Sequence, residues 1–187
     1  MSFDDLKKIL LSEKPSDLII KNEGAIFNLI PELKSCKGFN QNNIWHVFDV
    51  YEHILHVIDN VDCSLVLRVS ALFHDIGKPV VYVEDSNKVG HFPYHWIESL
   101  KIFDKYKDNF NLTVLELDHV KKLIFYHDIN INKLDEKRYN EFISDFNDKD
   151  LLKELFIIKR ADLKAQNPKY HYILSEYDEL EKKLQEM

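Results

Sequence analysis

The stretch Leu65–Phe73 (LVLRVSALF) is apolar on nearly all sides, and it leads directly into a histidine and an aspartate, His74 and Asp75. A helix without a polar face must be buried, so this segment is predicted to lie inside a helical core. Gly77-Lys78-Pro79 ends it. A charged aspartate at the end of such a helix is costly unless it is paired or bound to a metal. This segment alone leaves both options open for Asp75: a capping or salt-bridged residue beside a core histidine, or a metal ligand.

The rest of the 187 residues shows helical periodicity and few strand signals, and four glycines and five prolines suit long helices with tight connections. The length favours one domain. We therefore predict a single all-α bundle of about seven or eight helices. These are expected over Phe3–Leu11, Ser16–Ile30 with Ser16 as the N-cap, His46–Val61, Leu65–Phe73, Pro93–Tyr106, Val114–Tyr126, Leu151–Ala165 and Lys169–Gln185. Between them we expect a connector over Pro31–Asn43, an extended excursion or loop over Val80–Val89, and loops around one short helix over Asp128–Asp150.

Charge and cysteine content narrow the function classes. The formal net charge is −7, from 25 Lys and Arg against 32 Asp and Glu, which argues against an extended nucleic-acid surface. It leaves room for a small phosphate ligand held by one or two cations or by a metal. The two cysteines, Cys36 and Cys63, are too few for a disulfide framework or a cysteine-based zinc site. No signal peptide and no apolar run of about 18 residues is visible, so a cytoplasmic protein without a membrane partner is expected.

The sequence holds nine histidines, and several fall on one stripe of the expected helix His46–Val61. At 100° per residue, the apolar side chains share one arc and four polar ones share the adjacent arc. His46 and His53 lie nearest the apolar boundary, whereas Asp49 and His56 are expected to support the site or face solvent. The apolar arc consists of Val47, Val50, Tyr51, Ile54, Val57, Ile58 and Val61.

Other candidates lie at helix ends and on one later helix. Pro93 suits a first helical turn, which places His95 in that turn, and His127 stands at a helix C-terminus. Asp162 lies within an apolar helix. Three interpretations stay open for its carboxylate: a solvated charge, the ion-pair partner of a nearby Lys or Arg, or a metal ligand. Imidazole nitrogen with carboxylate oxygen and no thiolate suits Mn²⁺, Fe²⁺, Co²⁺, Ni²⁺ or Zn²⁺. Such an ion lowers the pKa of bound water and neutralises phosphate charge.

The ordered set His53, His74-Asp75 and Asp162 resembles the HD superfamily of metal-dependent phosphohydrolases. His95 and His127 resemble the subset that often holds two metals. More narrowly, six blocks resemble the HD domain of bacterial tRNA nucleotidyltransferases (CCA-adding enzymes), over about residues 27–166. The blocks are IPELKSCKGFNQ, HVFDVYEHILHVID, LRVSALFHDIGKP, GHFPYHWIES, FYHD and RADLKAQ. The nucleotidyltransferase head, with its Gly-Ser strand motif and paired aspartates, has no counterpart, so we expect a free-standing HD domain spanning residues 1–187 that adds no nucleotides.

The resemblance assigns roles to individual residues. It implies that His53, His74, Asp75 and Asp162 ligate one or two divalent ions (Mn, Fe, Co, Ni, Zn or Mg), and that His95 and His127 complete a second metal site or contact phosphate. Lys78 is expected to approach the substrate phosphate, the alternative being a surface lysine that caps the preceding helix. Arg160 is either a phosphate clamp or half of a salt bridge. The roles of His46, Asp49 and His91 stay open, and His56, His119 and His171 are expected to be structural or at the surface.

The implied activity is cleavage of a nucleotide-type phosphoester, either a 2′,3′-cyclic phosphodiester or a phosphomonoester. Water activated by the metal attacks phosphorus in line, Lys78 offsets the developing charge, and His127 or His95 protonates the leaving oxygen. The expected partner is a small phosphorylated substrate, a nucleotide or an RNA end. Two alternatives stay open: a non-catalytic module that binds a nucleotide or RNA end, and an HD 5′-nucleotidase or dinucleoside polyphosphate hydrolase.

Overall fold

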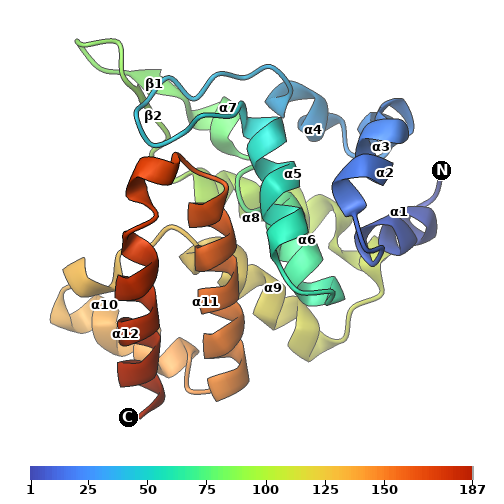
Figure 1. The fold of residues 1–187 in the computed structure, drawn as a ribbon. Coiled ribbons are helices and arrows are strands. Elements are labelled where there is room, and N and C mark those ends of the chain that lie inside the picture. The colour runs from blue at the N-terminus through green and yellow to red at the C-terminus, as the bar shows by residue number, and fades with distance from the viewer. Residues whose placement is uncertain (187) are drawn as a thin grey trace.

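The chain folds into helices α1 to α12 and one short hairpin, as the computed structural model of Figure 1 shows; it describes residues 1–186. The helices are α1 Phe3–Leu10, α2 Pro15–Lys21, α3 Glu23–Leu29, α4 Pro31–Cys36, α5 Val50–Asn60, α6 Leu65–Phe73, α7 Lys78–Val81, α8 His95–Tyr106, α9 Val114–Tyr126, α10 Glu136–Asp145, α11 Lys149–Lys164 and α12 Ile173–Gln185. The hairpin pairs β1 Val83–Glu84 with β2 Gly90–His91 in antiparallel register, Val83 opposite His91. The predicted all-α class is confirmed. Within residues 1–186, none of the helices has both the length and the apolar character that crossing a bilayer requires.

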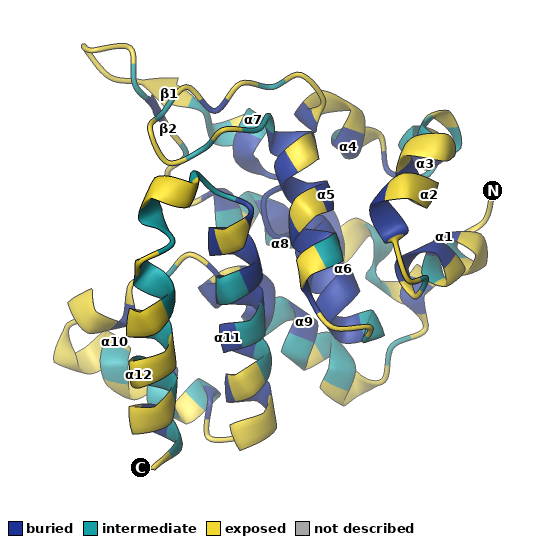
Figure 2. Ribbon diagram, viewed as in Figure 1, coloured by how far each residue is buried: buried dark blue, intermediate teal, exposed yellow. Residues whose placement is uncertain are grey.

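Helix α6 lies at the centre of the fold. Its residues from Val66 to Phe73 are all buried, and it packs against α5, α8, α9 and α11. Figure 2 shows the same inner faces as buried. Burying a side chain such as Leu72 or Phe73 contributes about 1.5–3 kcal/mol, so α6 holds the surrounding helices together. The residues that follow it, His74 and Asp75, are thereby placed deep in the molecule.

The N-terminal third contains more helices than the sequence pattern predicts. The expected helix over Ser16–Ile30 is divided at Asn22, which ends α2 and begins α3, and its side-chain amide donates to the carbonyl of Leu18 (2.8 Å). The expected connector over Pro31–Asn43 contains α4, which starts at Pro31 because the fixed φ of proline suits a first helical position.

Ser16 is not the N-cap of α2, because the helix already begins at Pro15 and Lys14 is the capping residue. The Ser16 hydroxyl instead donates to Oδ2 of Asp59 (2.6 Å), and its backbone N–H donates to Oδ1 (3.1 Å). This corrects the sequence prediction and ties α2 to the far end of α5.

Helix α5 begins at Val50 instead of His46. Asp49 has an extended backbone and caps the helix, since its Oδ1 accepts from the N–H of Glu52 (2.7 Å) and its Oδ2 from the N–H of Gly38 (2.7 Å). The predicted helical stripe therefore loses its first turn. Val47, predicted in the core, is 55% exposed.

The C-terminal half follows the pattern more closely. The segment predicted as loops around one short helix contains α10, and α11 starts at Lys149 because Asp148 caps it through the N–H groups of Asp150 and Leu151. The last helix starts at Ile173, after a 3₁₀ turn over Pro168–Tyr170. In Figure 1, α12 runs beside α11, with which it packs.

Candidate metal centre

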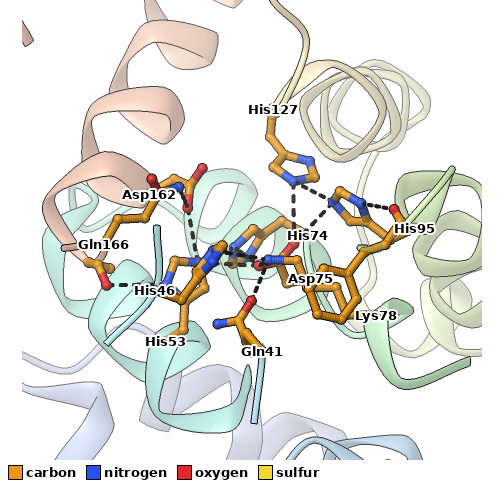
Figure 3. Close-up of polar contacts among 12 residues, drawn as sticks. Gln41, His46, His53, His74, Asp75, Lys78, His95, His127, Asp162 and Gln166 are labelled. Carbon is orange, nitrogen blue, oxygen red and sulfur yellow. Dashed lines mark hydrogen bonds and ion pairs between the residues drawn. The ribbon is translucent and has the colours of Figure 1, made fainter. Parts of the chain in front are cut away.

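Six side chains predicted as metal ligands meet in one buried cluster (Figure 3). They come from five helices and their ends: His53 from α5, His74 and Asp75 directly after α6, His95 as the first residue of α8, His127 at the C-cap of α9, and Asp162 from α11. Asp162 is the most exposed of them, at 8%. Because the core helices fix these positions, the cluster is assembled by packing of the fold.

Asp75 is the common partner of the four imidazoles. Its Oδ2 lies 3.3 Å from Nε2 of both His53 and His74, and its Oδ1 lies 3.2 Å from Nε2 of His95 and 3.4 Å from Nε2 of His127. The carboxylate thus divides the cluster into a first triad, His53–His74–Asp75, and a second triad, Asp75–His95–His127. In each triad one ligand atom per residue lies within 4.8 Å of the others. A carboxylate with one oxygen in each triad is suited to bridge two ions.

The Nδ1 atoms of the four histidines point away from Asp75, toward backbone carbonyls. A carbonyl oxygen only accepts, so each Nδ1 carries a proton, and in the neutral ring each Nε2 presents a lone pair to the cluster. Metal-binding histidines typically show this arrangement, with the outer nitrogen hydrogen-bonded. The Nδ1–oxygen distances are 3.3 Å for His53 to Ala165, 2.7 Å for His74 to Ala71, 3.0 Å for His95 to Phe92 and 2.8 Å for His127 to Ile124.

The Nε2 atoms also approach one another in pairs. His53 and His74 are 3.2 Å apart at Nε2, and His95 and His127 are 3.1 Å apart. Two lone pairs at such distances repel unless a cation or a proton lies between them. In addition, both oxygens of Asp75 are buried without a hydrogen bond of good geometry. This donor set of nitrogen and oxygen atoms therefore fits divalent metal ions.

The charges of the cluster perturb its titrating groups. Burial alone would lower the pKa of His53, but hydrogen bonds with Asp162 (2.9 Å) and Asp75 outweigh it and raise the pKa to about 9. Burial would raise the pKa of Asp75, yet the charges of Lys78 and His74 hold it well below its usual range. Burial would also raise the pKa of Asp162, but the hydrogen bond with His53 outweighs it and lowers that pKa. The two carboxylates stay ionised, and a proton competes with a metal ion for His53.

Lys78 points into the cluster. Its ammonium lies 2.6 Å from Oδ2 of Asp75, donates to Oε1 of Gln41 (2.8 Å) and lies 3.4 Å from Nε2 of His46. The side chain is buried, with Nζ 5.2 Å from the centre of the Phe92 ring. Lys78 is therefore not the surface capping lysine of the alternative interpretation.

Residues 44–165 match the HD domain model. The chain belongs to the HD domain family. The match contains all six clustered residues, from His53 to Asp162, so the buried cluster is the centre of the HD domain.

Two curated proteins share parts of this sequence. The chain is 31% identical over 85 residues to the Multifunctional CCA protein of Herminiimonas arsenicoxydans. The aligned region covers 42% of this chain and 20% of that protein. It is 32% identical over 89 residues to the A-adding tRNA nucleotidyltransferase of Deinococcus radiodurans. Here the aligned region covers 44% of this chain and 20% of that protein. The similarity thus extends over about a fifth of either relative, and it agrees with the resemblance found in the sequence.

The residues with open roles lie around the HD centre. His46 lies outside the helix, and its Nδ1 is 2.8 Å from Oδ1 of Asn43, while burial and the charge of Lys78 lower its pKa to about 2. It is therefore a neutral ring beside the cluster. Asp49 is a helix cap. His91 is exposed on β2, 3.3 Å from Oδ2 of Asp85.

Arg160 is not a phosphate clamp. Its Nε donates to Asp178 (2.8 Å) and its Nη2 donates to Glu181, both in α12, so the guanidinium joins α11 to α12. Of the three histidines outside the motif, His56 packs against the Phe48 ring and His119 pairs with Oε2 of Glu154 (2.9 Å). His171 is partly buried near the start of α12.

Three further residues at the site are not predicted from the sequence. Gln41 accepts from the ammonium of Lys78. The Ser99 hydroxyl donates to the carbonyl of His74 (2.8 Å) and accepts from the N–H of Gly77 (3.0 Å), which joins α8 to the turn after α6. Buried Lys159 lies three residues before Asp162 and therefore on the same face of α11, a spacing that could have revealed it. The positions of Gln41 and Ser99 carry no such signal.

A pocket of about 660 Å³ opens onto the cluster, within the size range of small-molecule sites. Its charged lining consists of two lysines, Lys78 and Lys159, and four carboxylates, Asp75, Asp128, Asp162 and Glu176. The protein groups alone therefore make the pocket negative.

Proposed function

We propose that this HD domain is a metal-dependent phosphohydrolase that cleaves a nucleotide-type phosphoester, either a 2′,3′-cyclic phosphodiester or a phosphomonoester. The observation that carries the proposal is the convergence of four histidine Nε2 atoms on the two oxygens of Asp75, beside a substrate-sized pocket that Asp75, His95, His127 and Asp162 help to line. The partial similarity to a CCA protein and to an A-adding tRNA nucleotidyltransferase favours nucleotides or RNA ends among phosphoesters.

The charge of the pocket supports the requirement for metal. Four carboxylates against two lysines would repel a phosphate. One divalent cation makes the charge of this lining neutral, and two make it positive. A phosphate dianion is therefore best accommodated with both triads loaded.

The geometry supports one assignment of the ligands. His53, His74, Asp75 and Asp162 would hold one ion, and Asp75, His95 and His127 would hold a second. An ion bound there supplies Lewis acidity toward the phosphoryl group and a water of lowered pKa. Magnesium, manganese, iron, cobalt, nickel and zinc all remain compatible with these donors.

The other groups orient the site. Lys78 pairs with Oδ2 of Asp75 and faces the pocket, so it positions the carboxylate that the two triads share and would offset charge on the phosphate. Both ring nitrogens of His95 and His127 are engaged, one with a backbone carbonyl and the other toward Asp75. We therefore assign these two histidines to the ligand set, not to protonation of the leaving oxygen.

The test uses the purified chain, treated with a chelator and reloaded with Mn²⁺, Co²⁺, Ni²⁺ or Mg²⁺. The substrates are 2′,3′-cyclic AMP, a nucleoside 5′-monophosphate, a dinucleoside polyphosphate and p-nitrophenyl phosphate. We expect hydrolysis with at least one metal and a loss of about 10³-fold or more in His74→Ala and Asp75→Ala. His119→Ala, which removes a histidine outside the cluster, should leave the rate unchanged.

Absence of hydrolysis with every metal, or unchanged rates in the two ligand variants, contradicts the proposal. Metal and nucleotide binding without turnover would support the non-catalytic module instead. The preferred substrate in the panel separates a cyclic phosphodiesterase from a 5′-nucleotidase or a dinucleoside polyphosphate hydrolase.

A further inference from the structure

The pocket extends beyond the metal centre to helix α12. On this side it is lined by Asn130 and Asn132 from the loop after α9 and by Ile173, Glu176, Tyr177 and Leu180 from α12. We call these six residues the α12 arm. Helix α12 follows residue 165, where the match to the HD domain ends. One wall of the pocket is thus supplied by a segment outside the matched domain.

Buried Lys159 joins the metal centre, the loop and α12. Its ammonium donates to the backbone carbonyls of His127 and Ile129 (2.8 Å each) and lies 5.4 Å from the centre of the Tyr177 ring. The side chain is 3% exposed, and within the described chain no carboxylate lies within 4 Å of its ammonium to pair with it. One lysine therefore fixes a metal-ligand segment, the loop and the helix relative to one another.

The next residue of α11 strengthens this attachment. Arg160 pairs with Asp178 and Glu181 on α12, and the Tyr177 ring packs edge-on against Phe156 of α11. The α12 arm is consequently a formed wall of the pocket before any ligand binds, and a preorganised wall loses less entropy when it receives one.

We propose that the α12 arm binds the nucleobase of a substrate whose phosphate lies at the metal centre. This inference rests on the proposed phosphohydrolase function and specifies that the substrate is a nucleotide. Ile173, Tyr177 and Leu180 offer apolar and aromatic surface, which suits the flat faces of a base. The amides of Asn130 and Asn132 and the carboxylate of Glu176 offer donors and acceptors for its polar edge.

Other ligands match this lining less well. A lipid chain would leave the two amides and the carboxylate without partners when it covered them. A bare phosphate would use neither the apolar wall nor most of the 660 Å³. A nucleotide would place its phosphate at the metal centre and its base against the α12 arm, and would therefore contact both ends of the pocket.

The test compares two probes that carry the same phosphate, adenosine 5′-monophosphate and ribose 5-phosphate. Their binding to the metal-loaded chain is measured by calorimetry, without reference to turnover. Because stacking contributes about 1–3 kcal/mol per base, the wild type should bind adenosine 5′-monophosphate roughly 5- to 150-fold more tightly. Ile173→Trp, which fills the arm, should remove this preference and leave the affinity for ribose 5-phosphate unchanged.

A second variant covers the case in which Ile173→Trp does not fold. Glu176→Ala changes an exposed residue of the arm, and Glu179→Ala, exposed on the same helix but outside the pocket lining, is its matched control. We expect a loss of a few-fold in adenosine 5′-monophosphate affinity for Glu176→Ala only. Lys159→Met, which removes the positioning contacts, should reduce the preference between the two probes, and Lys159→Arg should restore part of it.

Equal affinity of the wild type for both probes overturns the inference, and so does an Ile173→Trp variant that folds and keeps the preference or weakens both probes equally. Failure of the proposed function is distinguishable, because it appears as no hydrolysis of any phosphoester while the preference for adenosine 5′-monophosphate persists.

Discussion

The two triads share Asp75 but differ in their surroundings. In the first triad, His53 lies in the first turn of α5 and His74 directly after α6. A second carboxylate, Asp162, lies 2.9 Å from Nε2 of His53 and accepts from Gln166 (3.3 Å). In the second triad, His95 and His127 stand at the ends of α8 and α9. Within residues 1–186, Asp75 is the only carboxylate with an oxygen within 4 Å of the ring nitrogens of these two histidines.

This difference predicts that the two proposed sites would bind metal with different strength. Asp75 and Asp162 together would neutralise the charge of a divalent ion held by the first triad, whereas an ion at the second triad would have Asp75 as its carboxylate partner. We therefore expect the first triad to fill at lower metal concentration and the second to respond to small displacements of α8 and α9.

The largest expected effect tests this order directly. His53→Ala should abolish tight metal binding and reduce hydrolysis by about 10³-fold or more, because it removes a ligand from the stronger site. His127→Ala should leave about one metal per chain and reduce hydrolysis by roughly 10- to 100-fold. Metal content by mass spectrometry and steady-state rates measure both. Equal losses in the two variants would show that the triads act as one inseparable site.

A smaller effect is expected from Gly77, which lies in the turn after α6, two residues beyond Asp75. A Cβ at this position would lie 2.6 Å from the carbonyl oxygen of His95 and from the N–H nitrogen of Ser99. Both are backbone atoms of α8, so Gly77→Ala must move the helix end that carries His95. A displacement of about 1 Å can lower a rate by about 10²-fold, so we expect loss of the second metal and a roughly 10- to 100-fold lower rate.

The matched control for Gly77→Ala is Gly24→Ala. Gly24 lies in helix α3, and a Cβ added there would have no neighbouring heavy atom within 4 Å. Alanine at this position should therefore stabilise the fold by about 0.4–1 kcal/mol. Retention of both metals in Gly77→Ala would contradict the idea that the second triad depends on the position of α8.

The two triads also differ in how far the sequence predicts them. Leu65–Phe73 is apolar on nearly all sides, so its central position can be inferred without a structure, and the costly Asp75 indicates a paired or metal-bound site. The pattern cannot show that Asp75 offers one oxygen to each pair of histidines, because that follows from the packing of α8 and α9 against α6. Those contacts join residues that are distant in sequence.

Two sequence predictions, the start of α5 and the role of Arg160, fail or stay open because they depend on side-chain contacts that the hydrophobic pattern does not contain. The periodicity of Val47, Val50 and Tyr51 continues through His46 and predicts a helix there, but the cap formed by Asp49 starts the helix only after it. Arg160 stands two residues before Asp162 and could face either the pocket or α12. Arg160 forms a salt bridge because tertiary packing places the acidic residues Asp178 and Glu181 of α12 beside it.

Ser99 connects the two triads, and its removal should affect stability more than binding. Ser99→Ala leaves the carbonyl of His74 and the N–H of Gly77 buried without this partner, which costs about 1–3 kcal/mol. Ser70→Ala is the control, since the Ser70 hydroxyl, also buried, bonds only the carbonyl of Val66 in its own helix (2.8 Å). Denaturant titration should give a clearly smaller loss for Ser70→Ala. Equal losses would mean that the hydroxyl of Ser99 does not hold α8 to the turn.

The smallest expected effect concerns the far end of α5, the helix that carries His53. Burial would raise the pKa of Asp59, but hydrogen bonds from Lys14 and Ser16 outweigh it and lower the pKa below its usual value. A lowered carboxyl pKa stabilises the fold above the pKa of the unfolded chain, about 3.9, and this contribution is lost as the pH falls through the native value.

Asp59→Asn should therefore lower the unfolding free energy by about 1 kcal/mol near pH 7, a modest amount because water screens this partly exposed group. The difference from the wild type should shrink as the pH falls below about 4. Asp62→Asn, at an exposed position, should change the unfolding free energy little near pH 7. Metal content should be unaffected, since the core contacts of α5 with α6 and α11 hold His53 in place. Loss of metal from the first triad in Asp59→Asn would show instead that the N-terminal helices help to hold that triad.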